Sequence, residues 1–461
     1  MTAEELQYNK MTNTNVKKLV VTLGIPTIIS MLITSIYNLA DTFFVSQLGE
    51  SASGAVSVVF PLMAIIQAIG FTFGMGAGSV ISSKLGERKD EEAQINGSSA
   101  FYIAIAIGII ISIFSLIFIK PLLNLLGSTD TVLPYAVDYG KYIIFGFPIM
   151  IGSFVMNNIL RAEGKARFSM VGLTAGGILN IALDPLFIYV FEMGISGAAI
   201  ATIISQSVSF IILLSMFLFH KSIIRLSIRK ITKSLNIYLE IIKVGFPSMC
   251  RQGLASISSI LLNNAAKLYG GDAALSAMGI VHKVFTVIFS VSLGIGQGYQ
   301  PVCGYNYFAK KYSRVKEAMI FTLLVGIVLM SIFSIVFFIV AKDLLNTFID
   351  SEMAVKIGTK ALRLQCIAMP FQSLNVICNM TFQSTKQKLK ATILSCCRQG
   401  IFFIPSILLL PLIFEIDGVI LSQPIADLLT FVFTIPFFVI MIKKINQLIK
   451  KEEEVLNAEL N

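Results

Sequence analysis

Residues 19–48 read LVVTLGIPTIISMLITSIYNLADTFFVSQL, and Asp41 is the one charged side chain among them. A helix of about 20 mostly apolar residues crosses the hydrocarbon core of a bilayer. This stretch is longer, so it must tilt, bend or emerge from the membrane at one end. Pro26 provides a place to bend, because proline removes one backbone hydrogen bond from a helix. The stretch therefore predicts a bent membrane-spanning helix.

Eleven further apolar runs follow the first. Hydrophobic residues make up 55% of the 461-residue chain and charged residues only 13%, with a mean hydropathy of +0.81. Soluble domains carry about 25% charged residues, so the solvent of this chain must be largely lipid. We predict an all-α integral membrane protein with twelve transmembrane helices. The twelve runs are residues 19–48, 54–82, 99–119, 139–160, 168–190, 195–219, 239–268, 274–303, 318–341, 361–384, 391–413 and 417–441.

The basic residues predict how the helices are oriented. An even number of spans puts both termini on one side, and cytoplasmic loops are enriched in Lys and Arg. The termini and the loops after even-numbered runs hold 25 Lys and Arg; the opposite side holds six, which are Lys120, Lys141, Lys342, Lys356, Lys360 and Arg363. We therefore expect both termini in the cytoplasm. The net charge of +10 does not indicate nucleic-acid binding, because the basic residues lie in short loops between apolar runs.

The second half of the chain repeats the first. A shift of 221 residues places Gly24-Ile25-Pro26 on Gly245-Phe246-Pro247, and Gly197 on Gly418. Six helices in each half give two pseudo-symmetric lobes of the same orientation, and transporters built this way bind their solute between the repeats. The predicted division is a cytoplasmic N-terminal segment 1–18, an N-lobe 19–219, a basic cytoplasmic linker 220–238, a C-lobe 239–441 and a cytoplasmic tail 442–461.

Acids inside the spans mark a candidate site, because ionisable side chains in a membrane are costly and mostly functional. Asp41, Asp184 and Thr202 each lie six or seven residues from the outer end of their run, about 10 Å inside the boundary at 1.5 Å per residue. Asn180 precedes Asp184 by one helical turn. Their oxygens suit Na⁺, and a desolvated carboxylate beside a second acid also suits H⁺. We predict a cation-coupling site, able to hold Na⁺, at Asp41, Asn180, Asp184 and Thr202.

Other side chains are candidates for the solute cavity or for a gate. The cavity candidates are Tyr37, Asn38, Met31, Asn157, Asn158 and Gln300. Each has a packing alternative, because polar groups join membrane helices and methionine fills cores. In the second half Asp427 is the one deep acid, and we expect it to pair with Arg398 or Arg251. Sequence alone favours neither a structural role nor a gating role for that pair.

Several motifs resemble those of the multidrug and toxic compound extrusion (MATE) family, and together they cover nearly the whole chain. They are Gly24-Ile25-Pro26, Tyr37-Asn38-Leu39-Ala40-Asp41-Thr42-Phe43-Phe44-Val45, Gly74-x-Gly76-x-Gly78, Arg161-Ala162-x-Gly164, Asn180-x-x-x-Asp184-Pro185 and Gly296-Gln297-Gly298-x-Gln300-Pro301. The prokaryotic branch resembling DNA-damage-inducible and staphylococcal multidrug exporters fits best.

This resemblance implies a V-shaped exporter of two six-helix lobes in a prokaryotic plasma membrane. It implies secondary active multidrug efflux, in which cationic amphipathic compounds leave in exchange for Na⁺ or H⁺. Coupling would run through Asp41 and Asp184, with Asn180 and Thr202 assisting. We expect no cofactor, no use of ATP and no enzymatic activity, and a monomer whose partners are the bilayer and small solutes. Some relatives carry further acids in the second lobe, where this chain offers mainly Asp427.

Three other functions are less compatible with the sequence. A flippase for lipid-linked oligosaccharide or another lipid, of related architecture, would need a strongly basic cavity, and the first six runs contain no deep Lys or Arg. A channel or receptor fits poorly with two six-helix repeats and intramembrane acids. An enzyme is disfavoured because the chain has no Ser/His/Asp set, metal-ligand cluster or nucleotide-binding P-loop.

Overall fold

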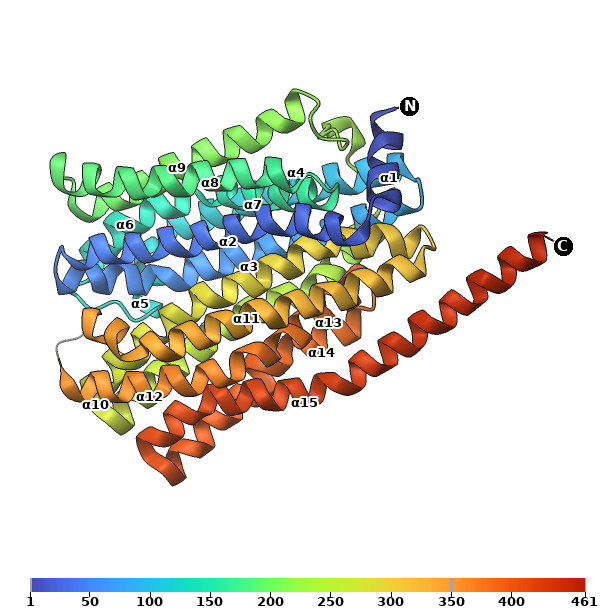
Figure 1. Ribbon diagram of the computed structural model, residues 1–461. Coiled ribbons are helices and arrows are strands. Elements are labelled where there is room, and N and C mark those ends of the chain that lie inside the picture. Colours follow the sequence, from blue (N-terminus) through green and yellow to red (C-terminus); the bar gives the residue numbers. More distant parts are fainter. Residues whose placement is uncertain (1, 349–350, 461) are drawn as a thin grey trace. The chain divides into compact units, whose positions relative to one another are not determined.

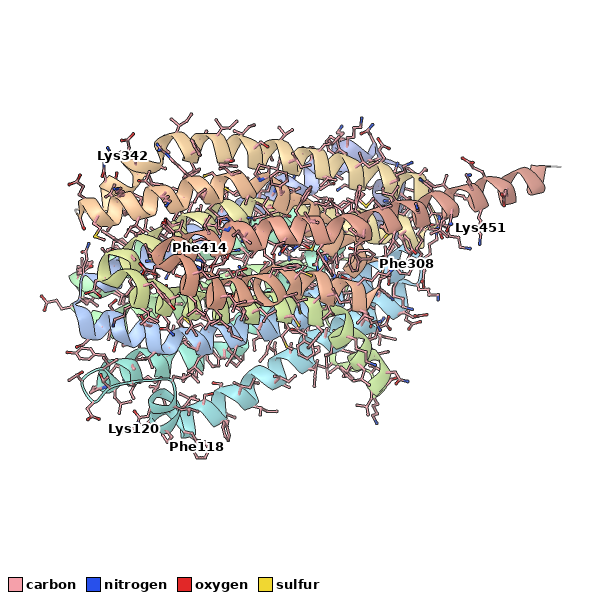
Figure 2. All side chains as sticks on the ribbon, turned by 90° about the horizontal axis from the view of Figure 1, so that it is seen from below. Phe118, Lys120, Phe308, Lys342, Phe414 and Lys451 are labelled. Atoms are coloured by element: carbon pink, nitrogen blue, oxygen red, sulfur yellow. The ribbon has the colours of Figure 1, made fainter. Side chains whose placement is uncertain are left out.

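The computed structural model describes residues 2–348 and 351–460 (Figure 1). Within these ranges every regular element is a helix, which confirms the predicted all-α class. Residues 1, 349–350 and 461 fall in the predicted N-terminal segment, C-lobe and tail, and lie outside the described residues. Large apolar side chains such as Phe118 and Phe414 are exposed on the outside of the helices, as a surface in contact with lipid requires (Figure 2).

The helices follow the order of the predicted runs. Those of the first half are α1 (Ala3–Asn13), α2 (Val16–Ser46), α3 (Glu50–Gly86), α4 (Asp90–Ile117), α5 (Ile119–Leu125), α6 (Leu133–Phe145), α7 (Phe147–Ala162), α8 (Ala166–Pro185), the π-helix η1 (Leu186–Val190) and α9 (Gly194–Leu218). After the short helix η2 (Ile228–Lys230) come α10 (Leu235–Phe308), α11 (Tyr312–Phe348), α12 (Glu352–Ala368), η3 (Met369–Phe371), α13 (Gln372–Ser384), α14 (Lys388–Cys396), the π-helix η4 (Cys397–Phe403) and α15 (Ile404–Leu460).

These helices account for the twelve predicted spans. Eight helical stretches of the described chain are long and apolar enough to cross a membrane, and α6 with α7, bent by 46°, make a ninth. Two of the stretches each contain two spans, because the backbone leaves helical geometry at Gly271 (φ 63°) in α10 and at Glu415 (φ 49°) in α15. The remaining run, 361–384, lies on α12, η3 and α13.

Turns with positive φ recur at the interval of the sequence repeat. The pairs, 221 or 222 residues apart, are Gly49 (107°) and Gly271 (63°), Arg88 (58°) and Lys310 (60°), Gly164 (78°) and Lys386 (56°), and Gly194 (56°) and Glu415 (49°). Glycine adopts this backbone region without steric cost, whereas other residues rarely do. Positions that hold glycine in one half and a charged residue in the other therefore report a shared fold. The two pseudo-symmetric halves are confirmed at the level of their turns.

The chain packs into two compact units. Unit 1 contains Met1–Tyr8 and Ile25–Gln252, and unit 2 contains Asn9–Gly24 and Gly253–Asn461. The predicted lobes are continuous in sequence, whereas each unit includes the beginning of a long helix from the other half: α2 up to Gly24 packs in unit 2, and α10 up to Gln252 packs in unit 1. The lobe boundaries at 219 and 239 remain a prediction.

Glycine contacts explain this exchange of helix ends. In unit 2, a Cβ on Gly298 would lie 2.5 Å from the Cα of Gly24. In unit 1, a Cβ on Gly245 would lie 1.9 Å from the carbonyl oxygen of Thr72. Membrane helices approach this closely only where small residues meet. Because Gly24 and Gly245 are equivalent under the 221-residue shift, a similar backbone contact forms once in each unit.

We expect Gly245→Ala to destabilise the protein by about 1–3 kcal/mol, because the added methyl group overlaps backbone that cannot rotate away. Gly253, on the same helix, is the matched control: a Cβ there meets no atom within 4 Å, so Gly253→Ala should be neutral or slightly stabilising. Thermal unfolding of the two purified variants in detergent measures the difference. Equal melting temperatures would contradict the close contact.

The segment after α9 is attached to unit 1 through the turn between α7 and α8. The buried Glu163 carboxylate accepts hydrogen bonds from the backbone N–H groups of Ile223 (2.8 Å) and Ile224 (3.0 Å) and from the Ser222 hydroxyl. The Lys165 ammonium lies 3.5 Å from the same carboxylate. The beginning of the predicted linker is thus held in place by specific bonds.

Candidate ion-coupling site and adjoining pocket

The candidate site is built on α8, which packs closely against two other helices of unit 1. A Cβ on Gly176 would lie 2.8 Å from the Ser209 Cβ of α9, and a Cβ on Gly177 would lie 2.6 Å from the Ile33 Cγ2 of α2. These glycines let α8 approach α2 and α9 one turn before Asn180. Pro185 then ends α8, and the π-helix η1 follows at once. Because proline cannot donate a backbone hydrogen bond, the helical register changes beside Asp184.

Three of the four predicted coupling residues lie together on α8 and α9. The Asn180 side-chain N–H donates to Asp184 Oδ1 (3.1 Å) and to Thr202 Oγ1 (3.4 Å). All three are buried, and Asp184 has no exposed surface. Asp184 Oδ2 and Asn180 Oδ1 are buried without a hydrogen-bond partner. Two oxygen acceptors are therefore left without a donor.

Asp41 brings a second carboxylate from α2. Its Oδ1 is also buried without a hydrogen-bond partner. It is close enough to Asp184 for the two charges to interact. Two neighbouring carboxylates with buried oxygens are costly unless a positive charge offsets them. Within the residues that the structure describes, no basic side chain forms an ion pair with either acid.

Tyr139 is a member of this group that the sequence did not reveal. Its hydroxyl is buried without a hydrogen-bond partner and lies close enough to Asp41 and Asp184 to interact with their charges. The predicted run began at residue 139, which put this tyrosine at the membrane boundary. The helix α6 in fact begins at Leu133, six residues earlier. The phenol therefore lies inside the span, at about the depth of the two acids.

This arrangement suits a small cation. Two carboxylates, an amide oxygen and a hydroxyl are hard ligands of the kind that bind Na⁺, and a proton on either acid would equally remove the repulsion. Asp41 Oδ1, Asp184 Oδ2 and Asn180 Oδ1 are the buried oxygens that such an ion would satisfy.

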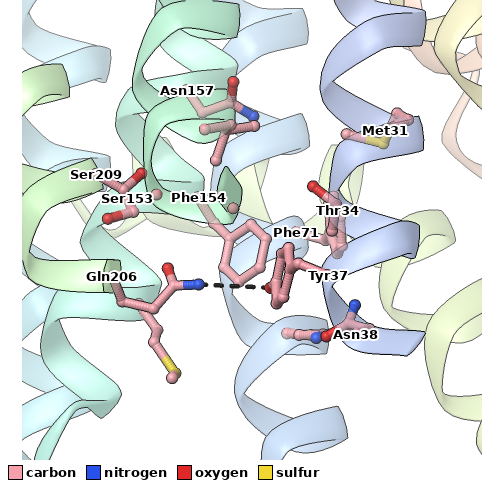
Figure 3. Close-up of a pocket in the computed structure, with 15 residues that line it drawn as sticks. Met31, Thr34, Tyr37, Asn38, Phe71, Ser153, Phe154, Asn157, Gln206 and Ser209 are labelled. Atoms are coloured by element: carbon pink, nitrogen blue, oxygen red, sulfur yellow. Dashed lines mark hydrogen bonds between the residues drawn. The ribbon is translucent and has the colours of Figure 1, made fainter. Parts of the chain in front are cut away.

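A pocket of about 80 Å³ lies between helices of unit 1, about one helical turn along α2, α8 and α9 from the candidate coupling residues (Figure 3). Its lining comes from α2, α3, α7, α8 and α9: Met31, Thr34, Tyr37, Asn38, Gln67, Phe71, Met150, Ser153, Phe154, Asn157, Leu173, Gly176, Gly177, Gln206 and Ser209. The Gln206 side-chain N–H donates to the Tyr37 hydroxyl (3.4 Å), which links α9 to α2 across it. Sites for drug-sized ligands measure about 300–1,000 Å³, so this pocket holds only part of such a ligand.

Four of the six predicted cavity residues line this pocket: Met31, Tyr37, Asn38 and Asn157. The other two are engaged elsewhere. Asn158 donates to the backbone of Phe154 (2.7 Å) and accepts from Arg161. Gln300, in unit 2, donates to the Gln383 side chain (3.1 Å). Gln206 was missed, although a polar residue one turn after Thr202 in an apolar run was a usable signal.

Asp427 in unit 2 differs from Asp41 and Asp184, because hydrogen-bond donors satisfy both of its carboxylate oxygens. Its Oδ1 accepts from Arg398 Nε (2.7 Å) and Gln423 (3.0 Å), and its Oδ2 accepts from Gln365 (2.6 Å) and Gln372 (2.7 Å). The Arg398 guanidinium also lies over the rings of Phe285 and Phe289, 4.8 and 4.5 Å from their centroids.

Of the two partners predicted for Asp427, the structure shows Arg398. Arg251 belongs to unit 1. The Asp427 carboxylate already has four donors, which leaves it little capacity for a transported cation.

The internal repeat also appears when the chain is compared with known proteins. The family profile described as MatE matches residues 26–186 and 247–408, whose starts are 221 residues apart. The chain is 26% identical over 405 residues to the multidrug export protein MepA of Staphylococcus saprophyticus subsp. saprophyticus, covering 88% of this chain and 89% of that protein. It is 27% identical over 405 residues to MepA of Staphylococcus aureus strain N315, with the same coverage.

Solved structures of MATE transporters also resemble this chain over nearly its whole length. One is the outward-facing conformation of a multidrug resistance MATE family transporter of the MOP superfamily, with a TM-score of 0.90 at 25% identity over 96% of this chain and 98% of that one. Another is a MATE in complex with MaL6, with a TM-score of 0.90 at 25% identity over 98% of this chain and 100% of that one.

Proposed function

Since the chain belongs to the MATE family, whose members are multi-pass membrane transporters and not enzymes, we propose that it exports cationic amphipathic compounds in exchange for Na⁺ or H⁺. The coupling ion would bind at Asp41, Asn180, Asp184 and Thr202. The observation that carries this proposal is a pair of neighbouring acids that have no basic partner among the described residues, each with one buried carboxylate oxygen that no donor satisfies.

The relatives support the substrate class. The staphylococcal proteins are multidrug export proteins of bacteria, which favours efflux at a prokaryotic plasma membrane. The pocket lining agrees with broad specificity. Met31 offers a flexible thioether, and Phe71 and Phe154 pack as a tilted pair, 5.1 Å between centroids. Such surfaces adapt to varied apolar shapes, and aromatic faces attract cations.

Coupling would arise because the drug cation and the coupling ion compete for the negative charges of Asp41 and Asp184. Tyr37 and Asn38 line the pocket and lie one turn before Asp41 on α2. A bound drug cation would gain from the Asp41 and Asp184 charges, and an arriving Na⁺ or H⁺ would cancel that gain. At a separation of roughly 4 Å and an effective dielectric constant of about 20, one charge pair is worth about 4 kcal/mol, or about a thousandfold in affinity. That difference between ion-bound and ion-free states would release the drug outward.

α2 offers a place for the accompanying movement. Pro26 leaves the carbonyl of Thr22 without its helical donor, and the division between the compact units crosses α2 between Gly24 and Ile25. We propose that α2 bends here when the ion binds. That bend would move the face carrying Met31, Tyr37 and Asp41 relative to α8.

The test is transport by purified protein in proteoliposomes with Na⁺ and pH gradients imposed separately. We expect the fluorescent lipophilic cation ethidium to move against its own gradient when one of these ion gradients is present, and not when both are collapsed. Movement that ignores both gradients would refute coupled antiport. Saturable counterflow distinguishes a carrier from a channel.

The flippase alternative has little support in the geometry. The lining of the unit 1 pocket contains no Lys or Arg, whereas a pyrophosphate-linked lipid would need basic groups. In the same proteoliposomes, fluorescent lipid flipping at the rate of protein-free vesicles would exclude it.

A further inference from the structure

The outer end of unit 2 contains a second, larger pocket that the transport mechanism does not use. It lies between α11 and α12 and has a volume of about 900 Å³. In Figure 2, Lys342 of this pocket lies at the opposite end of unit 2 from Lys451. Its lining residues are Phe338, Lys342, Asn346, Glu352, Val355, Lys356, Thr359, Lys360, Arg363, Leu364 and Ile367.

The pocket contains more basic residues than is usual on the outer side of a membrane. Four of its lining residues are Lys or Arg and one is acidic. Those four are Lys342, Lys356, Lys360 and Arg363, which are four of the six basic residues that the sequence assigns to the outer side. Because Lys and Arg are disfavoured on that side, their collection in one place indicates an anionic counterpart.

Two of the basic residues have partners within the protein and two have none among the described residues. Lys360 pairs with Asp417 at 2.7 Å. Arg363 donates to the carbonyl oxygen of Phe338 (3.2 Å) and lies 5.3 Å from the centre of its ring, which ties α12 to α11. In the described part of the chain, neither Lys342 nor Lys356 forms an ion pair. Their ammonium groups are available to a ligand.

The pocket changes from basic to apolar toward the membrane interior. Along α12, Lys356, Lys360 and Arg363 are spaced by four and three residues and so share a face, and Ile367 continues that face one turn further in. Ile367 is 56% exposed. On α11 the nearby Ile335 and Ile339 are 61% and 67% exposed, so this side of the helix faces lipid. A ligand that fits would carry a negative charge at its outer end and hydrocarbon at its inner end.

A buried hydroxyl also requires a partner. Thr359 lines the pocket, and its Oγ1 is buried without a hydrogen-bond partner. An unsatisfied buried hydroxyl is costly, and a phosphate or glycerol oxygen in the pocket would satisfy it.

We propose that this pocket binds an anionic phospholipid of the outer leaflet. Its phosphate would lie between Lys342 and Lys356 with Lys360 beside them, and an acyl chain would run inward past Ile367. Free phosphate would match the basic end alone and would leave the apolar end without an occupant.

The test is native mass spectrometry of the delipidated full-length protein, titrated in detergent with dioleoyl-phosphatidylglycerol or dioleoyl-phosphatidylcholine. We expect one high-affinity phosphatidylglycerol adduct and no comparable phosphatidylcholine adduct. The double variant Lys342→Ala/Lys356→Ala should weaken phosphatidylglycerol binding about 25-fold, from about fivefold for each lysine facing an anionic headgroup. Thr359→Val should weaken it about threefold to tenfold, the effect of one hydrogen bond.

The matched control is Lys120→Ala/Lys141→Ala, which removes the same charge from the outer side of unit 1. It should leave phosphatidylglycerol binding unchanged. Equal weakening in both double variants, or equal affinity for the two lipids, would overturn the proposal. Displacement of the lipid by 10 mM inorganic phosphate would assign the pocket to free phosphate instead. Unchanged melting temperatures without lipid show that the variants are folded.

Discussion

Asp41→Asn should abolish ion-driven drug transport while leaving the folded protein intact. The amide keeps the size of the carboxylate but can carry neither the negative charge nor the exchangeable proton. Loss of one charge pair worth about 4 kcal/mol predicts a fall in coupled transport of about a thousandfold. The measurement is the initial rate of ethidium transport into proteoliposomes under whichever ion gradient drives the wild-type protein.

Stability separates this loss of coupling from a folding defect. Asp41 Oδ1 is buried without a donor and near Asp184, so removing its charge removes repulsion. Asp41→Asn should therefore keep or raise the melting temperature. The matched control is Asp138→Asn, which changes an exposed acid of α6 that pairs with Lys141 and should leave transport unchanged. Wild-type transport by the Asp41 variant would refute the coupling site.

The second acid should behave as part of the same unit. Asp184→Asn is expected to lose coupling as completely as Asp41→Asn, and the double variant should lose no more than either single variant. Residues that act together give such non-additive effects. Additive losses would instead indicate two independent ion sites.

Local helix geometry explains what the sequence predicted well. Asn180 and Asp184 are four residues apart on one helix, so their hydrogen bond follows from spacing alone. Thr202 was predicted at the depth of the two acids because all three lie six or seven residues from the outer end of their run. The apolar runs located the spans, and the internal repeat related the two halves, because several of the glycines that mark it are turn or crossing points in the structure.

Features that depend on packing between distant segments were not predictable. Nothing local indicates that residues 9–24 pack in unit 2 and residues 239–252 in unit 1. The choice between Arg398 and Arg251 for Asp427 likewise needed the tertiary arrangement. The run predicted at 361 begins at Glu352 in the structure, because Lys356 and Lys360 lower the hydropathy of that stretch. The residues that concealed the start of α12 are those that make the outer pocket basic.

Asp427→Asn should destabilise unit 2 by about 3–5 kcal/mol, the cost of breaking a buried ion pair. Arg398 would keep its buried charge without compensation. The new amide N–H₂ would also face Gln365 or Gln372, which donate to the carboxylate in the wild-type protein. Denaturant or thermal unfolding in detergent measures the loss, and comparison with an Arg398→Leu/Asp427→Leu double variant isolates the pair. The double variant should be less destabilised than the single substitution, because it leaves no lone charge.

The same Asp→Asn substitution should thus have opposite effects on stability in the two halves. Asp41 lacks a donor on a buried oxygen and has an acidic neighbour, so neutralising it removes charge repulsion and also removes coupling. Asp427 has four donors and a basic neighbour, so neutralising it removes bonds that join α12, α13, η4 and α15. If Asp427→Asn instead keeps full stability and stops transport, the pair is a gate or a second coupling site. A loss of stability with residual transport in proportion to folded protein assigns it a structural role.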